Sequence, residues 1–160
     1  MSEKELSSTT RIERSATIEV NAPPDEAFPL FTPLGEGLWS EDWDPVFRHP
    51  EEAELEDRAV FTTPDGPGGD RVWTILKYRP GKHRISYLCI TPGLLHSWID
   101  ISCEGTGMGT SKVEVAYTDT ALSEKGQAYI ERDSEEAFTS RIGHWEHAIN
   151  RYLRSGGSRT

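Results

Sequence analysis

The sequence predicts an α+β protein in which a curved antiparallel sheet of about six to seven strands wraps around a long C-terminal helix, with two short helices after the first strand. Three observations lead to this prediction. Residues 123–154 carry apolar side chains at helical spacing, residues 11–21 alternate as in a strand, and residues 53–120 form strand-like runs separated by short turns. A single helix can bury its apolar stripe only against the sheet, so helix and sheet form two layers.

Residues 123–154 are predicted to form one continuous helix. Ser123 is a suitable N-cap, Glu124 is favourable in the first turn, and Gly156 can end the helix. At 1.5 Å per residue such a helix would be about 48 Å long. The apolar stripe expected to face the sheet consists of Ile130, Ala137, Phe138, Ile142, Trp145, Ile149, Tyr152 and Leu153.

The first strand is predicted at residues 11–21, where apolar residues at even positions share one face and only Arg14 interrupts it. The prolines that follow end the strand, begin a short helix and keep it short. Trp39 and Trp43 are four residues apart, which places them on one face of a second short helix. Pro45 ends that helix, and a strand is expected after it.

The middle of the chain is predicted to be an antiparallel meander. Its turns are DGPGGD at residues 65–70, PGK at residues 80–82, PG at residues 92–93, and the glycine-rich residues 105–109. The strands are expected at residues 59–63, 71–79, 83–91, 95–103 and 111–120. Counting from the turns predicts four cross-strand pairs: Ile75 with Tyr87, Trp73 with Cys89, Ile101 with Val113, and Ile99 with Val115.

The composition disfavours nucleic acid and membranes as partners. The 160 residues include 17 Lys and Arg against 27 Asp and Glu, so the net charge of −10 repels phosphate backbones and anionic lipid surfaces. No run of 18 apolar residues is present, which argues against membrane insertion. The first residues contain no hydrophobic signal region, so we expect a cytoplasmic location.

The length fits one domain, expected at residues 11–154 with flexible tails at residues 1–10 and 155–160. Cys89 and Cys103 are expected to be free buried thiols, because their strands offset them along a hairpin beyond disulfide reach. We expect a monomer or a homodimer. A strongly curved sheet cannot contact a helix along its whole length, so a mostly apolar cavity is expected between them.

Three stretches carry a resemblance to a known group of proteins. They are ATIEVNAPPDEAFPLFTPLGEGLWSEDWDP, RVWTILKYRPGKHRISYLCITPG and VEVAYTDTALSEKGQ. Together they resemble the helix-grip superfamily, which includes polyketide cyclases, START lipid-transfer domains and birch-pollen-allergen-like proteins, and are most similar to bacterial members without an assigned activity. The resemblance covers about residues 11–153 and implies the same fold. Because the superfamily hosts carriers, receptors, cyclases and co-chaperone-like proteins, it implies no single function.

The candidate ligand site is the apolar face of the predicted cavity. Trp39 and Trp43 are expected at its entrance, where they either stack on a ligand or pin the short helices to the sheet. Tyr87 and Tyr117 either orient a ligand oxygen or are ordinary core tyrosines. The predicted lining residues are Phe31, Trp39, Trp43, Phe61, Trp73, Ile75, Tyr87, Tyr117, Phe138 and Ile142.

No motif in the sequence assigns a catalytic residue, a cofactor or a metal. His144 and His147 have neither a third ligand nor HExxH spacing, and we expect both to face solvent. The carboxylates at residues 41, 42 and 44 are predicted to form a solvated acidic face. The glycine-rich turns precede no helix and read as hairpin loops, and no Gly-x-Ser-x-Gly elbow is present.

These observations favour a binding protein for an apolar small molecule such as a lipid, an aromatic or a polyketide-like compound. The first alternative is an enzyme of the polyketide cyclase or aromatase kind that uses the same cavity, since such catalysis depends largely on orientation. The second alternative is a co-chaperone-like interaction module, although the charged outer face of the long helix offers no apolar docking patch. Without a convincing catalytic set, the balance favours binding over catalysis.

Overall fold

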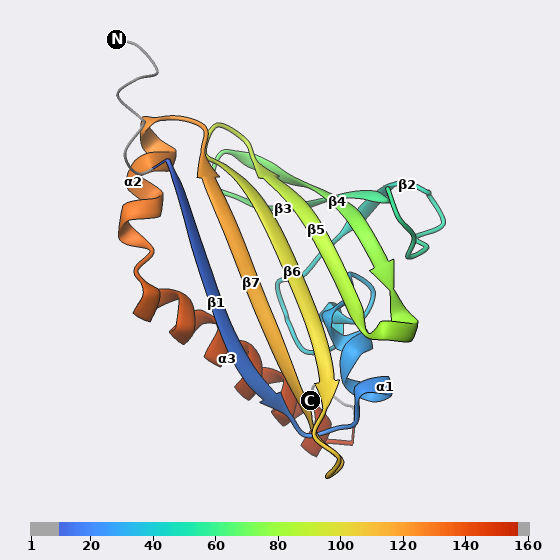
Figure 1. The fold of residues 1–160 in the computed structure, drawn as a ribbon. Helices are drawn as coiled ribbons and strands as arrows, with labels where there is room; N and C mark the ends of the chain where they lie inside the picture. The colour runs from blue at the N-terminus through green and yellow to red at the C-terminus, as the bar shows by residue number, and fades with distance from the viewer. Residues whose placement is uncertain (1–9, 157–160) are drawn as a thin grey trace.

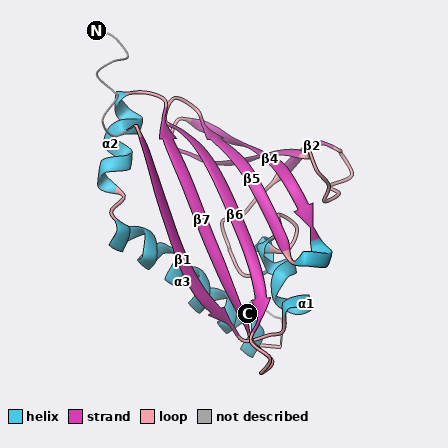
Figure 2. Ribbon diagram, viewed as in Figure 1, coloured by secondary structure: helices cyan, strands magenta, loops and turns pink. Residues whose placement is uncertain are grey.

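The structure, a computed structural model, describes residues 10–156 and consists of one antiparallel sheet covered on one face by helices (Figures 1 and 2). The seven strands lie in the order β1-β7-β6-β5-β4-β3-β2. They are β1 (Arg11–Val20), β2 (Val46–His49), β3 (Val60–Gly66), β4 (Gly69–Arg79), β5 (Arg84–Thr91), β6 (Leu95–Gly105) and β7 (Ser111–Ala121). The helices are α1 (Pro24–Ala27), α2 (Glu124–Arg132) and α3 (Glu135–Arg154), with 3₁₀ helices η2 (Phe28–Phe31), η3 (Glu36–Leu38) and η4 (Pro80–Lys82).

This arrangement confirms the predicted α+β fold, in which α3 passes behind β1 and β7 in Figure 1. Phe138, Ile142 and Ile149 on α3 are fully buried and provide its contact with the core. Ala137, which was expected in the same stripe, is exposed. Most of the predicted flexible tails lie outside the described residues. Within residues 10–156, no helix is long and apolar enough to cross a membrane.

The prediction of one continuous C-terminal helix is wrong, because the chain breaks between α2 and α3. Ser134 is extended and caps α3 by accepting a hydrogen bond from the backbone N–H of Ala137 at 3.0 Å. The carbonyl of Asp133, released from the helix, accepts bonds from Arg14 Nε at 3.3 Å and Nη2 at 3.2 Å. Arg14, which interrupts the apolar face of β1, therefore satisfies the backbone where the helix breaks.

The register of the central hairpin is confirmed, with Trp73 opposite Cys89 and Ile75 opposite Tyr87. The later hairpin pairs Ile99 with Tyr117 instead of Val115, and Ile101 with Val115 instead of Val113. Its loop closes between Thr106 and Thr110, so it is centred one residue later than the sequence suggested. The shift in pairing is two residues and leaves every side chain on its predicted face.

The second short helix is shorter than predicted and does not hold both tryptophans. The 3₁₀ helix η3 ends before Trp39, and Trp43 lies in the loop that follows. Each indole is instead held by a main-chain carbonyl from the segment preceding η3. Trp39 Nε1 donates to Leu30 at 2.7 Å, and Trp43 Nε1 donates to Pro33 at 2.8 Å.

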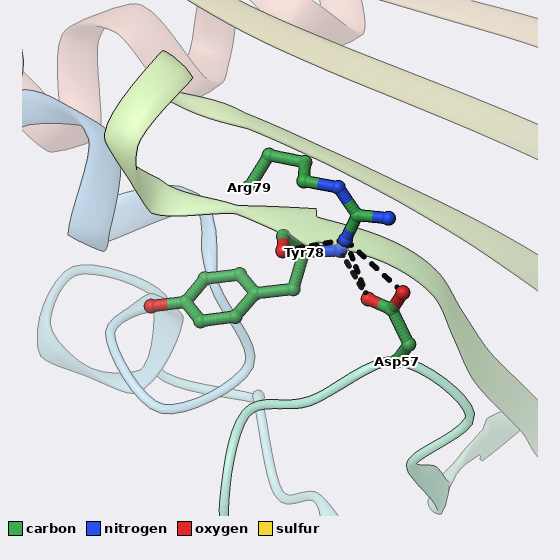
Figure 3. A network of polar contacts seen from close by, with 3 residues as sticks. All are labelled: Asp57, Tyr78 and Arg79. Atoms are coloured by element: carbon green, nitrogen blue, oxygen red, sulfur yellow. Dashed lines mark hydrogen bonds and ion pairs between the residues drawn. The ribbon is translucent and has the colours of Figure 1, made fainter.

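The loop before β3 is tied to the end of β4 by Asp57 (Figure 3). Its carboxylate accepts from the backbone N–H of Tyr78 at 2.8 Å, and Arg79 Nη1 donates to both carboxylate oxygens, at 2.9 and 3.0 Å. The bond from Arg79, followed by the backbone bond, lowers the pKa of Asp57. These bonds follow an irregularity in β4 between Ile75 and Lys77, after which Tyr78 points to the core side and packs on Phe28.

Candidate functional site

The side chains between the sheet and α3 leave an aromatic pocket of about 40 Å³. This volume holds little more than a water molecule, so the aromatic pocket is almost filled by its own side chains. The residues that line it come from the short helices, the loop after η3, four central strands and α3. They are Phe31, Glu36, Trp39, Trp43, Trp73, Tyr87, Ile99, Ile101, Tyr117 and Trp145.

The aromatic rings are arranged around Trp73. Phe61 stacks on Trp73 with centroids 5.6 Å apart, and Trp43 and Tyr87 each meet it edge-on at 5.7 Å. Trp73 Nε1 donates to Thr63 Oγ1 at 3.0 Å, which holds the indole in this orientation. On the other side of the aromatic pocket, Trp39 and Trp145 lie 6.0 Å apart and link the short helices to α3.

The two tyrosines differ in what their hydroxyls do. Tyr87 is buried and donates its hydroxyl hydrogen to the carbonyl of Phe31 at 2.8 Å. This hydrogen bond is part of the folded structure, so the hydrogen is not free to bond a ligand. Tyr117 packs edge-on against Phe138 at 5.3 Å, with the Arg141 guanidinium over its ring at 5.9 Å. Burial raises the pKa of both phenols, so both stay neutral at physiological pH. Among residues 10–156, no group hydrogen-bonds the Tyr117 hydroxyl, which leaves it available to a ligand.

Glu36 is the acidic group of the aromatic pocket, and the sequence did not single it out. Burial, and to a smaller extent the nearby charge of Asp65, raises its pKa from 4.5 to about 8. No donor in the described part of the chain hydrogen-bonds its carboxyl group. At pH 7 this group is therefore mostly a neutral acid that can donate a proton or a hydrogen bond. Its only sequence signal is a lone Glu between two glycines before Trp39.

A second cavity, the polar pocket, adjoins the aromatic pocket and has a volume of about 200 Å³. The two share Trp73, Ile99 and Tyr117 as a common wall. The polar pocket ends near the break between α2 and α3. Its other lining residues are Arg71, Cys89, Thr91, Leu95, Ser97, Asp119, Tyr129, Asp133 and Arg141.

Asp119 is the unusual residue of the polar pocket. It is 6% exposed, and its Oδ1 atom has no hydrogen-bond partner among residues 10–156. Burial raises the pKa of its carboxyl group, and a hydrogen bond from Ser97 opposes the rise. The other acid, Asp133, is bound to Arg141 Nη1 at 2.9 Å. Cys89 is not a nucleophile here, because burial raises the pKa of its thiol to about 12.

The structure brings six of the ten predicted lining residues together in the aromatic pocket. These are Phe31, Trp39, Trp43, Trp73, Tyr87 and Tyr117. The other four, Phe61, Ile75, Phe138 and Ile142, are fully buried behind it and belong to the packed core. Besides Glu36, the prediction missed Ile99, Ile101, Trp145 and Asp119, although strand parity or the helical stripe placed all four on the inner face.

The other polar candidates lie away from the cavity. His144 and His147 are exposed, and so are the carboxylates at residues 41, 42 and 44. His83 is bound to Asp25 at 2.8 Å outside both pockets. Across residues 10–156, no three His, Cys, Asp or Glu side chains are grouped to hold a metal ion. The larger depression of about 510 Å³ is open and is lined mostly by charged residues such as Lys77, Arg84 and Glu114, on the outer face of the sheet.

A sheet that grips a helix over an aromatic pocket defines the helix-grip class of proteins. Residues 11–142 match the family described as polyketide cyclase / dehydrase and lipid transport, and this chain belongs to that family. A comparison with curated proteins found no match.

Solved structures share this fold at low sequence identity. Norcoclaurine synthase from Thalictrum flavum gives a TM-score of 0.66 at 11% identity, over 96% of this chain and 92% of its own. The Zhui aromatase/cyclase from Streptomyces sp. R1128 gives 0.61 at 14% identity, over 92% and 99%. Ara h 8.0201 also gives 0.61 at 14% identity, over 91% and 99%. At these identities the likeness shows the shared fold alone.

Proposed function

We propose that this protein binds a small aromatic molecule between the sheet and α3. The observation that carries the proposal is the convergence of Trp39, Trp43, Trp73 and Trp145 on one apolar pocket from three separate segments, namely the loop after η3, β4 and α3. Packing alone does not need so many indoles around one point, whereas an aromatic ligand gains from each ring it meets. The membership of the polyketide cyclase and lipid-transport family supports an apolar ligand as well.

The size of the cavities limits the ligand. The polar pocket measures about 200 Å³ and the aromatic pocket about 40 Å³, both below the roughly 300–1,000 Å³ of drug-sized ligand sites. A ligand with a single ring or a fused bicycle is small enough to lie against the wall that the two pockets share, which is formed by Trp73, Ile99 and Tyr117. A lipid or a long polyketide chain would first have to displace side chains of the aromatic pocket, in which the Trp43 and Trp145 indoles are only half-buried.

The proposal is tested by calorimetric titration of the full chain with p-xylene, a probe of one ring and no polar atom. Ile99→Phe fills the shared wall and should weaken binding by at least about tenfold, because a well-packed core does not accept both the larger side chain and the probe. Ile90→Phe is the matched control, since Ile90 lies on the outer face of the adjacent strand. If Ile99→Phe binds p-xylene as wild type does, the ligand site is elsewhere and the proposal fails.

Glu36 favours a second candidate function, a proton-transfer enzyme of the cyclase kind. A carboxyl group with a pKa of about 8 can donate its proton to a ligand carbonyl oxygen at neutral pH. Turnover of a synthetic poly-β-ketone thioester should then decline as the pH rises through about 8, and Glu36→Gln should abolish it. A variant that retains wild-type turnover would exclude this role for Glu36.

The cytoplasmic location and the monomeric or homodimeric state expected from the sequence remain predictions.

A further inference from the structure

One row of side chains crosses the inner face of the sheet and changes from apolar to acidic. Strand register pairs Trp73 on β4 with Cys89 on β5, Cys89 with Ser97 on β6, and Ser97 with Asp119 on β7. Three strand spacings separate the ends of this row, which is about 14 Å between Cα atoms. All four side chains line the polar pocket, so a molecule lying along the row meets an indole at one end and a carboxylate at the other.

Asp119 is the group in this row that has unused hydrogen-bonding capacity. A buried carboxylate oxygen without a donor costs stability, so its presence requires a reason beyond packing. The charges around it are already engaged in part. Arg141 is bound to Asp133 at 2.9 Å. Arg71 Nε, which also has no hydrogen-bond partner in the described part of the chain, lies 4.0 Å from Asp65.

These charges define what the polar pocket accepts. Arg71 and Arg141 oppose a ligand cation, and Asp119 with Asp133 opposes a ligand anion. A neutral hydrogen-bond donor on the ligand can satisfy Asp119 Oδ1 without bringing another charge into the cavity. The adjoining rings of Trp73 and Tyr117 then require that this donor be attached to an aromatic or similarly flat apolar body.

We propose that the polar pocket binds the hydroxyl group of a small phenol or aromatic alcohol, which donates its hydrogen to Asp119 Oδ1 while its ring lies against Trp73 and Tyr117. The inference rests on the proposed function, since it assigns the polar end of the same ligand. It adds a substrate class and makes Asp119 the residue that distinguishes a hydroxylated ring from a plain one.

The experiment compares p-cresol with p-xylene, which differ by a hydroxyl in place of one methyl group, by calorimetric titration of the full chain. Asp119→Ala should weaken p-cresol about tenfold, the usual effect of losing a hydrogen bond to a charged group, and leave p-xylene within about twofold. Asp100→Ala removes the same group from the exposed outer face of β6 and should change neither affinity. Asp119→Asn keeps the size of the side chain and serves if the alanine variant does not fold; it should weaken p-cresol several-fold.

The outcomes separate the two proposals. If p-xylene binds but p-cresol affinity is the same in wild type and Asp119→Ala, the hydroxyl subsite is wrong and the aromatic ligand site stands. If the Asp119 variants lose affinity equally for p-cresol and p-xylene, the role of Asp119 is purely structural, and the hydroxyl subsite is again wrong. If neither probe binds the wild-type protein, both proposals fail together.

Discussion

Tyr87 donates its hydroxyl hydrogen to the main-chain carbonyl of Phe31 at 2.8 Å, and this bond joins the centre of the sheet to the short helices that close the aromatic pocket. The hydroxyl of Tyr117, on the same face of the sheet, has no such partner among the described residues. The two phenols that sequence parity treats as a pair therefore have different roles. Tyr87 holds the wall of the pocket, while Tyr117 presents a free hydroxyl to it.

We therefore predict that Tyr87→Phe lowers the free energy of unfolding by about 1–2 kcal/mol, because the variant leaves the Phe31 carbonyl buried without a donor. Tyr117→Phe should change it by less than about 0.5 kcal/mol, since no hydrogen bond within the described chain is lost. Urea unfolding of both variants, followed by tryptophan fluorescence, measures the difference. Equal losses in the two variants would contradict the assignment of roles.

Glu36 predicts a pH dependence of stability that is opposite to that of an ordinary surface carboxylate. Its folded pKa of about 8 lies above the unfolded value of 4.5, so its contribution to stability is fully present below pH 4.5 and is lost as the pH rises to about 8. For a single proton the loss is at most about 1.4 kcal/mol per pH unit.

The measurement is the unfolding free energy of wild type and Glu36→Gln in urea between pH 5 and pH 9. The glutamine variant should gain stability relative to wild type as the pH increases, and the difference should level off above about 8. The exposed Glu41→Gln is the control and should run parallel to wild type. A Glu36→Gln difference that is constant across this range would show that the carboxyl group is not held neutral.

The sequence predicted the sheet well because strand parity is a local property. Trp73, Tyr87 and Tyr117 alternate with outward residues, and even the two-residue error in the last hairpin preserves their face. Asp119 follows the same parity, so its inward position was readable from the pattern of β7. The helix break had a local signal in Ser134, an N-cap residue followed by Glu135 and Glu136, which the continuous apolar period obscured. The bonds from Arg14 to the Asp133 carbonyl were not readable, because Arg14 is distant in sequence.

Glu36 could not be predicted from the sequence because its position is set by distant contacts. The chain around it forms only a 3₁₀ helix of three residues, and its path is held by the Trp39 and Trp43 indoles bonded to carbonyls nine and ten residues earlier. The local pattern predicts a short helix marked by two tryptophans and does not single out the acid. The acid that faces the pocket is therefore visible only when these long-range bonds are known.

Two glycines in the C-terminal helices predict opposite effects of the same substitution. Gly126 in α2 is buried, and an added Cβ would collide with the main-chain carbonyl of Leu94 in the turn between β5 and β6. Gly126→Ala should therefore lower the unfolding free energy by about 1–3 kcal/mol, as expected for overpacking. An added Cβ at Gly143 in α3 meets nothing within 4 Å, so Gly143→Ala should raise it by about 0.5–1 kcal/mol.

Thermal unfolding of the two glycine variants, with helix content monitored by circular dichroism, tests this pair. The expected result is a lower Tm for Gly126→Ala and a higher Tm for Gly143→Ala than for wild type. A Gly126→Ala variant as stable as wild type would mean that α2 is not docked closely on the turn that contains Leu94.

The Asp57–Arg79 contact predicts a stability effect on the acid side of the pH range. Because the pKa of Asp57 is lowered in the folded state, its contribution is present above the unfolded pKa of 3.8 and is lost as the pH falls through the folded value. Asp57→Asn should therefore be less stable than wild type at pH 7, and the two should converge as the pH is lowered toward 3. The exposed Asp70→Asn in β4 is the control. Urea unfolding from pH 7 down to pH 3 gives the difference directly, and a gap that widens on acidification would contradict the role of this carboxylate in tying the loop to β4.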